Sequence, residues 1–264
     1  MKKILLLSTL FIGILTVFAH EYILVADSFR LKKGDNLEMH LFVSDGFNIQ
    51  LERPINKTAT LKFELITSDS TIDLSINENG TLPVISRKVF FEGGGLIHME
   101  RDYARITLAT DKFMDYLKED HIDGIPALVD KTKKEQKERY TRYIKSLVQS
   151  EGSYKDTLYK KITGQAFEIV LLQNPYTLRV GDSLKAKILF QGKPLSKKII
   201  TARNRTRNLA AITSTSRTNA KGICSFKMSR KGDWFLHATY MIPNQDKSDS
   251  DWESFWTSYS FGID

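Results

Sequence analysis

Disulfide bonds, membrane-length apolar runs and familiar catalytic motifs are all missing from this chain of 264 residues. The single cysteine, Cys224, excludes an internal disulfide, so an apolar core has to stabilise the fold. The apolar run from Ile4 to Phe18 has about 15 residues, whereas a membrane-spanning helix needs roughly 20. Gly-x-Ser-x-Gly, Walker and His-Glu-x-x-His sequences are absent, and we therefore expect a protein that is not an enzyme.

The first 19 residues are typical of a secretory signal peptide. Lys2 and Lys3 precede the apolar run, and Val17 and Ala19 occupy the −3 and −1 positions of a small-residue cleavage site. The run is short for an uncleaved anchor, which is the alternative. We predict cleavage between Ala19 and His20 and a periplasmic mature chain, since export without disulfides fits a bacterial periplasm.

The net charge is positive but dispersed. The whole chain carries +8, and removal of two lysines with the signal leaves 37 basic and 31 acidic residues, or +6. Dispersed basicity supports solubility and does not indicate nucleic-acid recognition, so no nucleic-acid partner is expected.

Alternating apolar residues predict strands on both sides of a helical segment. In the first part, "NLEMHLFVS", "ATLKFELIT", "VISRKVFFE" and "YARITLAT" repeat with a period of two and are separated by turn-forming clusters. Seven strands are expected after residue 164, in "AFEIVLLQ", "SLKAKILF", "KKIITARN", "AAITSTSR", "GICSFKMS", "DWFLHATYMI" and "SFWTSYSFGI". This number and spacing favour an immunoglobulin-like or transthyretin-like sandwich.

Two helices are predicted between these β regions. "DKFMDYLKED" and "KTKKEQKERYTRYIKSLVQS" place apolar residues three and four apart; in the second these are Tyr140, Tyr143, Ile144, Leu147 and Val148. The expected fold is mainly β: two antiparallel β-sandwich domains with a helical insertion between them. Its parts are a signal peptide (1–19), an N-terminal sandwich (20–110), the insertion (111–163) and a C-terminal sandwich (164–264).

Histidines are the candidate metal ligands. If His20 is the first mature residue, its amine and imidazole offer two nitrogen donors for a divalent metal. We predict His20, His40, His98 and His237 as ligands, with nickel or cobalt as the metal and copper or zinc as alternatives. Glu38 with His40, and His98 with Glu100, are spaced by two and would share a strand face. Each internal histidine, including His121, has the alternative of an ordinary hydrogen-bonded or helix-ending residue.

Segments along nearly the whole mature chain resemble a family of exported bacterial proteins. They are "AHEYIL", "KKGDNLEMHLFVSDGF", "ERYTRYIKSLV", "NPYTLRVGDSLKAKILFQGKPL", "NAKGICSFKMSRKGDWFLHATYM" and "DWESFWTSYSF". The family is a domain of unknown function whose members are often described as periplasmic components of nickel or cobalt uptake systems. The resemblance implies a periplasmic, divalent-metal-associated protein, and a membrane metal transporter is the partner we predict for it. Some nickel-uptake proteins chelate with a histidine at the third mature position; here it is first, which leaves a two-point chelate.

The alternative function is a structural or adhesive envelope protein with incidental histidines. It would bind glycan or another protein through an aromatic C-terminal strand comprising Trp252, Phe255, Trp256, Tyr259 and Phe261, although core packing is the default for these residues. A copper-oxidising site that also begins with a terminal histidine is a minor alternative, since donor identity discriminates metals poorly.

Overall fold

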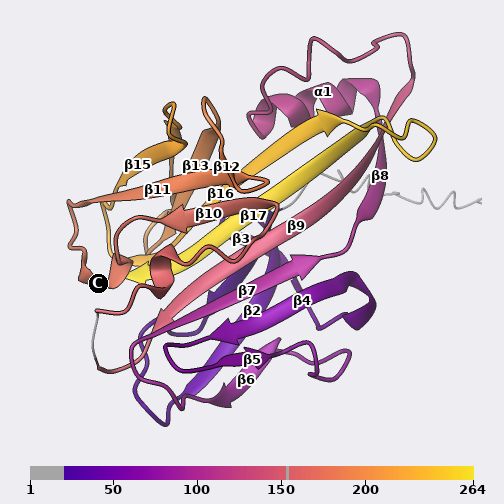
Figure 1. Cartoon of the computed structure of the whole chain (residues 1–264). Coiled ribbons are helices and arrows are strands. Elements are labelled where there is room, and N and C mark those ends of the chain that lie inside the picture. The colour runs from indigo at the N-terminus through magenta and orange to yellow at the C-terminus, as the bar shows by residue number, and fades with distance from the viewer. Residues whose placement is uncertain (1–20, 153–154) are drawn as a thin grey trace, which may run out of the picture.

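The computed structural model describes residues 21–152 and 155–264, and in these ranges the chain is mainly β (Figure 1). Nine described strands form one sheet, named here the long sheet, in the order β14-β13-β16-β17-β9-β7-β4-β5 with β8 also paired to β9. Their bounds are β4 Thr60–Ile66, β5 Thr71–Asp73, β7 Gly94–Arg101, β8 Ala104–Ala109, β9 Glu135–Gln149, β13 Ile199–Arg205, β14 Ile212–Arg217, β16 Gly232–Pro243 and β17 Trp252–Ile263.

Two smaller sheets, of four described strands each, complete the β structure. The N-terminal sheet consists of β1 Glu21–Ala26, β2 Asn36–Asp45, β3 Asn48–Arg53 and β6 Ile85–Lys88. The C-terminal sheet consists of β10 Phe167–Leu171, β11 Ser183–Phe190, β12 Lys193–Pro194 and β15 Ile223–Lys227. The described helical elements are α1 Thr110–Glu119 and three 3₁₀ turns, Lys57–Ala59, Leu158–Lys160 and Pro175–Thr177.

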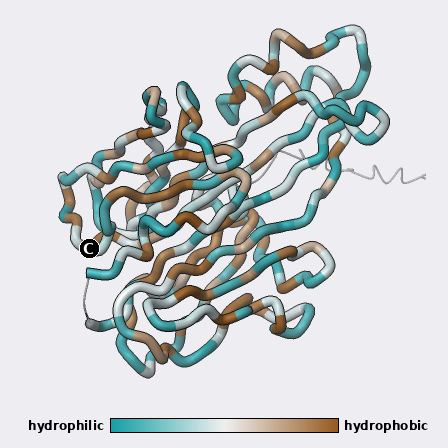
Figure 2. The backbone as a smooth tube through the Cα atoms, in the orientation of Figure 1, coloured by the Kyte–Doolittle hydropathy of each residue, from teal (hydrophilic) through white to brown (hydrophobic). Residues whose placement is uncertain are grey.

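The smaller sheets cover opposite faces of the long sheet along β17. Ser258 Oγ donates to Tyr22 O of the N-terminal sheet at 2.7 Å, whereas Phe255 packs edge-on against Phe190 of the C-terminal sheet at 5.0 Å. Even- and odd-numbered residues of a strand point to opposite faces. At β17 the long sheet is therefore the middle layer of three, with one smaller sheet on each face. Figure 2 shows hydrophobic residues along the strands and hydrophilic ones in the connecting loops.

The mainly β fold, the helix at 111–120 and the seven C-terminal strands are confirmed. In α1, Phe113, Tyr116 and Leu117 are buried at helical spacing, and Phe113 and Tyr116 stack on Trp252 and Trp256 at 5.8 and 5.9 Å. No helix among the described residues is long and apolar enough to cross a membrane.

The second predicted helix, over 131–150, is wrong: residues 135–149 form the central strand β9. Consecutive Ile144 and Lys145 are each 1% exposed, because β9 is covered on both faces, so its apolar residues need not alternate. Lys145 is held by an ion pair to the equally buried Glu168 and donates to Ile169 O at 3.2 Å. Polar residues occupy buried positions of β9, so its apolar residues do not alternate. The apolar residues that remain are three and four apart, which is the spacing that predicted a helix.

The domain boundaries at residues 110 and 163 remain predictions. The long sheet contains strands from both expected sandwiches, and β9, which falls in the expected insertion, lies between them: it pairs antiparallel with β7 and parallel with β17.

Candidate functional site

The predicted metal ligands lie in different parts of the fold. His40 is on β2 of the N-terminal sheet, whereas His98 on β7 and His237 on β16 belong to the two halves of the long sheet. His20 lies outside the described residues. Over 21–152 and 155–264, no three His, Cys, Asp or Glu side chains are grouped so that they could hold a metal ion.

His40 is held between two carboxylates. Its Nδ1 lies 2.7 Å from Glu52 Oε1, its Nε2 lies 3.1 Å from Asp27 Oδ1, and its ring stacks on Phe42 at 5.4 Å. Both nitrogens are therefore committed to local hydrogen bonds.

His98 is fully buried and pairs across the sheet. Its Nε2 lies 2.8 Å from Glu64 Oε2, the residue directly opposite on β4, and burial lowers the pKa of its imidazole despite this carboxylate. His98 and Glu100 were predicted to share a strand face; the contact of His98 is instead with Glu64, because a cross-strand neighbour lies closer than a same-strand neighbour. Glu38 likewise accepts from Ser86 at 2.8 Å instead of pairing with His40.

His237 lies against the first described residue. Its Nε2 is 2.8 Å from Glu21 Oε1, and both side chains are more than nine-tenths buried. Glu21 also accepts from Gly46 N at 2.8 Å and has Arg203 Nη2 at 3.4 Å. We call Glu21, His237 and Arg203 the Glu21 cluster.

Several buried polar atoms in and beside the Glu21 cluster have no well-formed hydrogen bond within the described part of the chain. They are both ring nitrogens of His237 and the Nε atoms of Arg142 and Arg203. The 2.8 Å separation of His237 and Glu21 is thus a close contact without hydrogen-bond geometry. Glu21, Arg142 and His237 line a cavity of about 10 Å³, the size of one water molecule. Unused donors around such a space indicate a polar group that the described residues do not supply.

Two carboxyl groups near His237 have shifted pKa values. Burial alone would raise the pKa of Glu21, but the adjacent His237, Arg203 and the Gly46 N–H outweigh it and lower the pKa. Asp120, at the end of α1, accepts from Thr239 Oγ1 at 3.2 Å, and burial raises its pKa to about 7 although His237 opposes this. Thr239 and His237 are two apart on β16, so their side chains share one face of the strand.

The sequence alone did not single out Glu21, Asp120 or Arg203. The available signal for Glu21 was its position directly after His20, and for Asp120 its position at the end of a predicted helix. His121, also considered, offers its carbonyl oxygen to Lys198 Nζ at 2.7 Å.

The aromatic C-terminal strand belongs to the core. Trp252, Phe255, Trp256, Tyr259 and Phe261 are each at most 5% exposed, and the Trp252 and Trp256 Nε1 atoms donate to Gln136 and Ser254. These rings therefore offer no exposed stacking surface for a glycan. Cys224 is 3% exposed, as expected for a packed residue.

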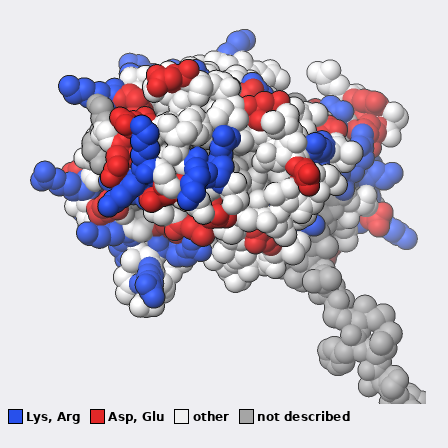
Figure 3. All heavy atoms as spheres, turned by 90° about the horizontal axis from the view of Figure 1, so that it is seen from below, with Lys and Arg blue, Asp and Glu red and all other residues white. Residues whose placement is uncertain are grey.

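Basic and acidic side chains are interspersed on the face of the molecule seen in Figure 3. This mixture agrees with the dispersed charge of the sequence.

The family described as "Domain of unknown function (DUF4198)" matches residues 17–242. No curated protein matches the chain. Two solved structures show weak similarity. The D0-D1 domain of intimin is 11% identical with a TM-score of 0.21, covering 90% of this chain and 96% of its own. A marsupial T cell receptor is 10% identical with a TM-score of 0.21, covering 90% and 73%. TM-scores this low support no argument about fold or function.

Proposed function

This chain belongs to the DUF4198 family of unknown function, and from that premise we propose that it is an exported, non-enzymatic protein that binds a divalent metal for an uptake system. The proposed metal is nickel or cobalt, with copper or zinc as alternatives, and the proposed partner is a membrane metal transporter in the periplasm. The observation that carries the proposal is the Glu21–His237 contact directly beside the predicted mature N-terminus.

His20 directly precedes Glu21 in the chain, and we propose that it takes part in this contact. Consecutive Cα atoms are about 3.8 Å apart, so the amine of a chain starting at His20 begins within one residue of Glu21. The proposed ligands are this amine, the His20 imidazole, His237 and the Glu21 carboxylate. Metal–nitrogen and metal–oxygen bonds of about 2.0 Å that meet at 90°, as in square-planar or octahedral coordination, would place neighbouring ligand atoms about 2.8 Å apart, which equals the Nε2–Oε1 separation here.

The Nδ1 atom of His237, which is buried and has no hydrogen-bond partner among the described residues, supports the same assignment. A histidine coordinates a metal through a ring nitrogen that carries no proton and makes no other strong bond. By contrast, both nitrogens of His40 face carboxylates, and His98 is paired to Glu64 in the interior. The proposal therefore rests on His20 and His237, while His40 serves as a control.

The test is calorimetric titration of the mature chain with nickel, cobalt, copper and zinc. We expect binding tighter than about 1 mM. Acetylation of the N-terminal amine or His237→Gln should weaken binding at least about tenfold, and His40→Gln should leave it unchanged. Absence of binding, or binding indifferent to a blocked amine, would refute the proposal. Mass spectrometry of the exported protein checks that it begins at His20.

A further inference from the structure

A second cavity, of about 380 Å³, lies beside the loop that follows α1. Small-molecule pockets typically have volumes of roughly 300 to 1,000 Å³, so the cavity can hold a compact ligand. Its lining combines apolar Ile122 and Met241 with three cations, Lys197, Lys198 and Arg217, and one carboxylate, Asp123. The lining therefore carries a net charge of about +2 when the lysines are protonated.

Lys198 is a buried cation without a carboxylate partner. The residue is 6% exposed, and within the described ranges no carboxylate oxygen lies at ion-pair distance from its Nζ. One hydrogen bond is seen for this ammonium group, to His121 O at 2.7 Å, although it has three N–H donors. Burial lowers the pKa of Lys198 to about 8, with Asp120 and Asp123 opposing, so the group is mostly charged at pH 7. An enclosed cation is costly unless an anion accompanies it.

Arg217 sits at the same cavity in an exchangeable ion pair. Its Nη1 lies 2.9 Å from Asp123 Oδ2, and the two side chains are 52% and 62% exposed. Exposed pairs of this kind contribute about 0 to 1 kcal/mol, so a ligand carboxylate can replace Asp123 at little cost. The planar guanidinium then offers two parallel donors to that carboxylate.

The backbone turns on both sides of the cavity, where His121 and Lys197 adopt left-handed φ values of 52° and 60°. At His121 this conformation ends α1, since Ile122 N donates to Leu117 O at 2.8 Å and His121 N donates to Lys118 O at 3.3 Å, the hydrogen-bond pattern found at many helix ends. The two turns position the His121 carbonyl and the Lys197–Lys198 segment around the same space.

We propose that this cavity binds a small organic acid, whose carboxylate pairs with Lys198 and Arg217 while its apolar part contacts Ile122 and Met241. The inference is independent of the proposed metal site, which uses other residues.

The test is calorimetric titration of the mature, metal-free protein with benzoate, citrate and inorganic phosphate. At least one organic acid should show saturable binding at a concentration below about 10 mM. Arg217→Gln should weaken it at least about tenfold, and Asp123→Asn should tighten it by removing the competing carboxylate. Arg207→Gln, which changes an exposed charge in the turn after β13, is the matched control and should have no effect.

The proposal would be overturned by no saturable binding of either organic acid, by equal binding to Arg217→Gln, or by an equal loss in Arg207→Gln. Binding of phosphate alone would also overturn it. Circular dichroism of each variant checks that the fold is retained, and Arg217, being half exposed, is not needed for the core.

Discussion

At the residue scale, the buried carboxyl group of Glu138 has no cation at ion-pair distance in the described part of the chain. Glu138 is 2% exposed and accepts hydrogen bonds from Tyr116 Oη at 3.2 Å and from Ser254 Oγ. Burial raises the pKa of Glu138 to about 7, although these hydrogen bonds oppose the rise. At low pH the group can be neutral, and at high pH it is a buried charge.

We predict that Glu138 makes the protein less stable as the pH rises. An unfolded glutamate titrates near pH 4.5, so from there to about pH 7 the folded protein retains a proton that the unfolded chain releases. The stability that this group contributes is greatest below pH 4.5. It falls by roughly 3 kcal/mol between pH 4.5 and about 7 and is constant above that. Between pH 5 and pH 8, the free energy of unfolding in urea should therefore fall by about 2 to 3 kcal/mol more for the wild type than for Glu138→Gln.

The control for this comparison is Glu78→Gln, which changes an exposed carboxylate and should behave as the wild type. If Glu138→Gln keeps the full pH dependence of the wild type, Glu138 is not the group responsible.

The sequence did not predict which side chains contact the histidines of the candidate site. The spacing of two between His98 and Glu100 was visible, but the actual partner, Glu64, is 34 positions away and opposite only because β4 and β7 pair. Glu21 and His237 are further apart still and meet through packing of the N-terminal sheet on the long sheet. The cleavage-site sequence predicts that His20 is the first mature residue, and this prediction lies outside the described residues.

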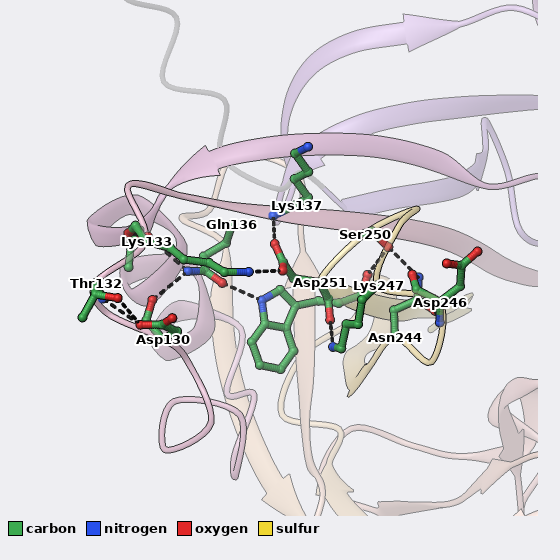
Figure 4. A network of polar contacts seen from close by, with 12 residues as sticks. Asp130, Thr132, Lys133, Gln136, Lys137, Asn244, Asp246, Lys247, Ser250 and Asp251 are labelled. Atoms are coloured by element: carbon green, nitrogen blue, oxygen red, sulfur yellow. Dashed lines mark hydrogen bonds and ion pairs between the residues drawn. The ribbon is translucent and has the colours of Figure 1, made fainter.

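At the element scale, the parallel pair β9–β17 depends on a polar network at its start (Figure 4). Asp251, just before β17, lies 2.7 Å from Lys133 Nζ and accepts from Lys137 N at 2.9 Å. In the other direction, Asp251 N donates to Lys137 O at 2.8 Å. Asp251 therefore joins the starts of two strands that are far apart in sequence.

We predict that Asp251→Asn destabilises the protein by about 1 kcal/mol at neutral pH, since a charge-assisted hydrogen bond becomes a neutral one. Burial alone would raise the pKa of Asp251, but the hydrogen bonds from Lys133 and Lys137 outweigh it and lower the pKa. The contribution is present above the ordinary aspartate pKa of 3.8 and is lost as the pH falls through the lowered value. The difference between wild type and variant in urea unfolding should therefore be seen at pH 7 and shrink toward pH 3. Asp69→Asn, on an exposed turn, should show no such difference.

Elements were predictable where one face is apolar and the other polar. β2 and β11 alternate in burial and were found from their sequences. β9 buries Gln136 and Glu138, which bind Trp252 and Ser254 across the sheet, so its interior face looks polar in the sequence. These residues can be buried because they form hydrogen bonds to a strand far away in the sequence. The local pattern of apolar residues does not reveal such hydrogen bonds.

At the scale of the whole molecule, the long sheet joins the two expected sandwiches through shared strands. β9 lies between β7 from the first half and β17 from the second, and Figure 1 shows these strands running side by side across the middle of the fold. The buried pair Lys145–Glu168 also crosses the predicted boundary at residue 163. A strand between two others contributes hydrogen bonds on both edges, so its removal leaves both neighbours with open edges.

We therefore predict that fragments 20–163 and 164–264 do not fold separately. In the second fragment, β17 would lose β9 on one edge and β1 on one face, and Glu168 would be buried without Lys145. An unpaired buried charge costs about 3 to 5 kcal/mol, a large part of the stability of a typical domain. Nuclear magnetic resonance spectra of each fragment should lack the dispersion of a folded β protein, and mixing the two should restore it. The intact mature chain, by comparison, should unfold in one transition. A dispersed spectrum and a cooperative melt for 164–264 alone would instead show that the C-terminal half is an autonomous domain, with β9 dispensable to it.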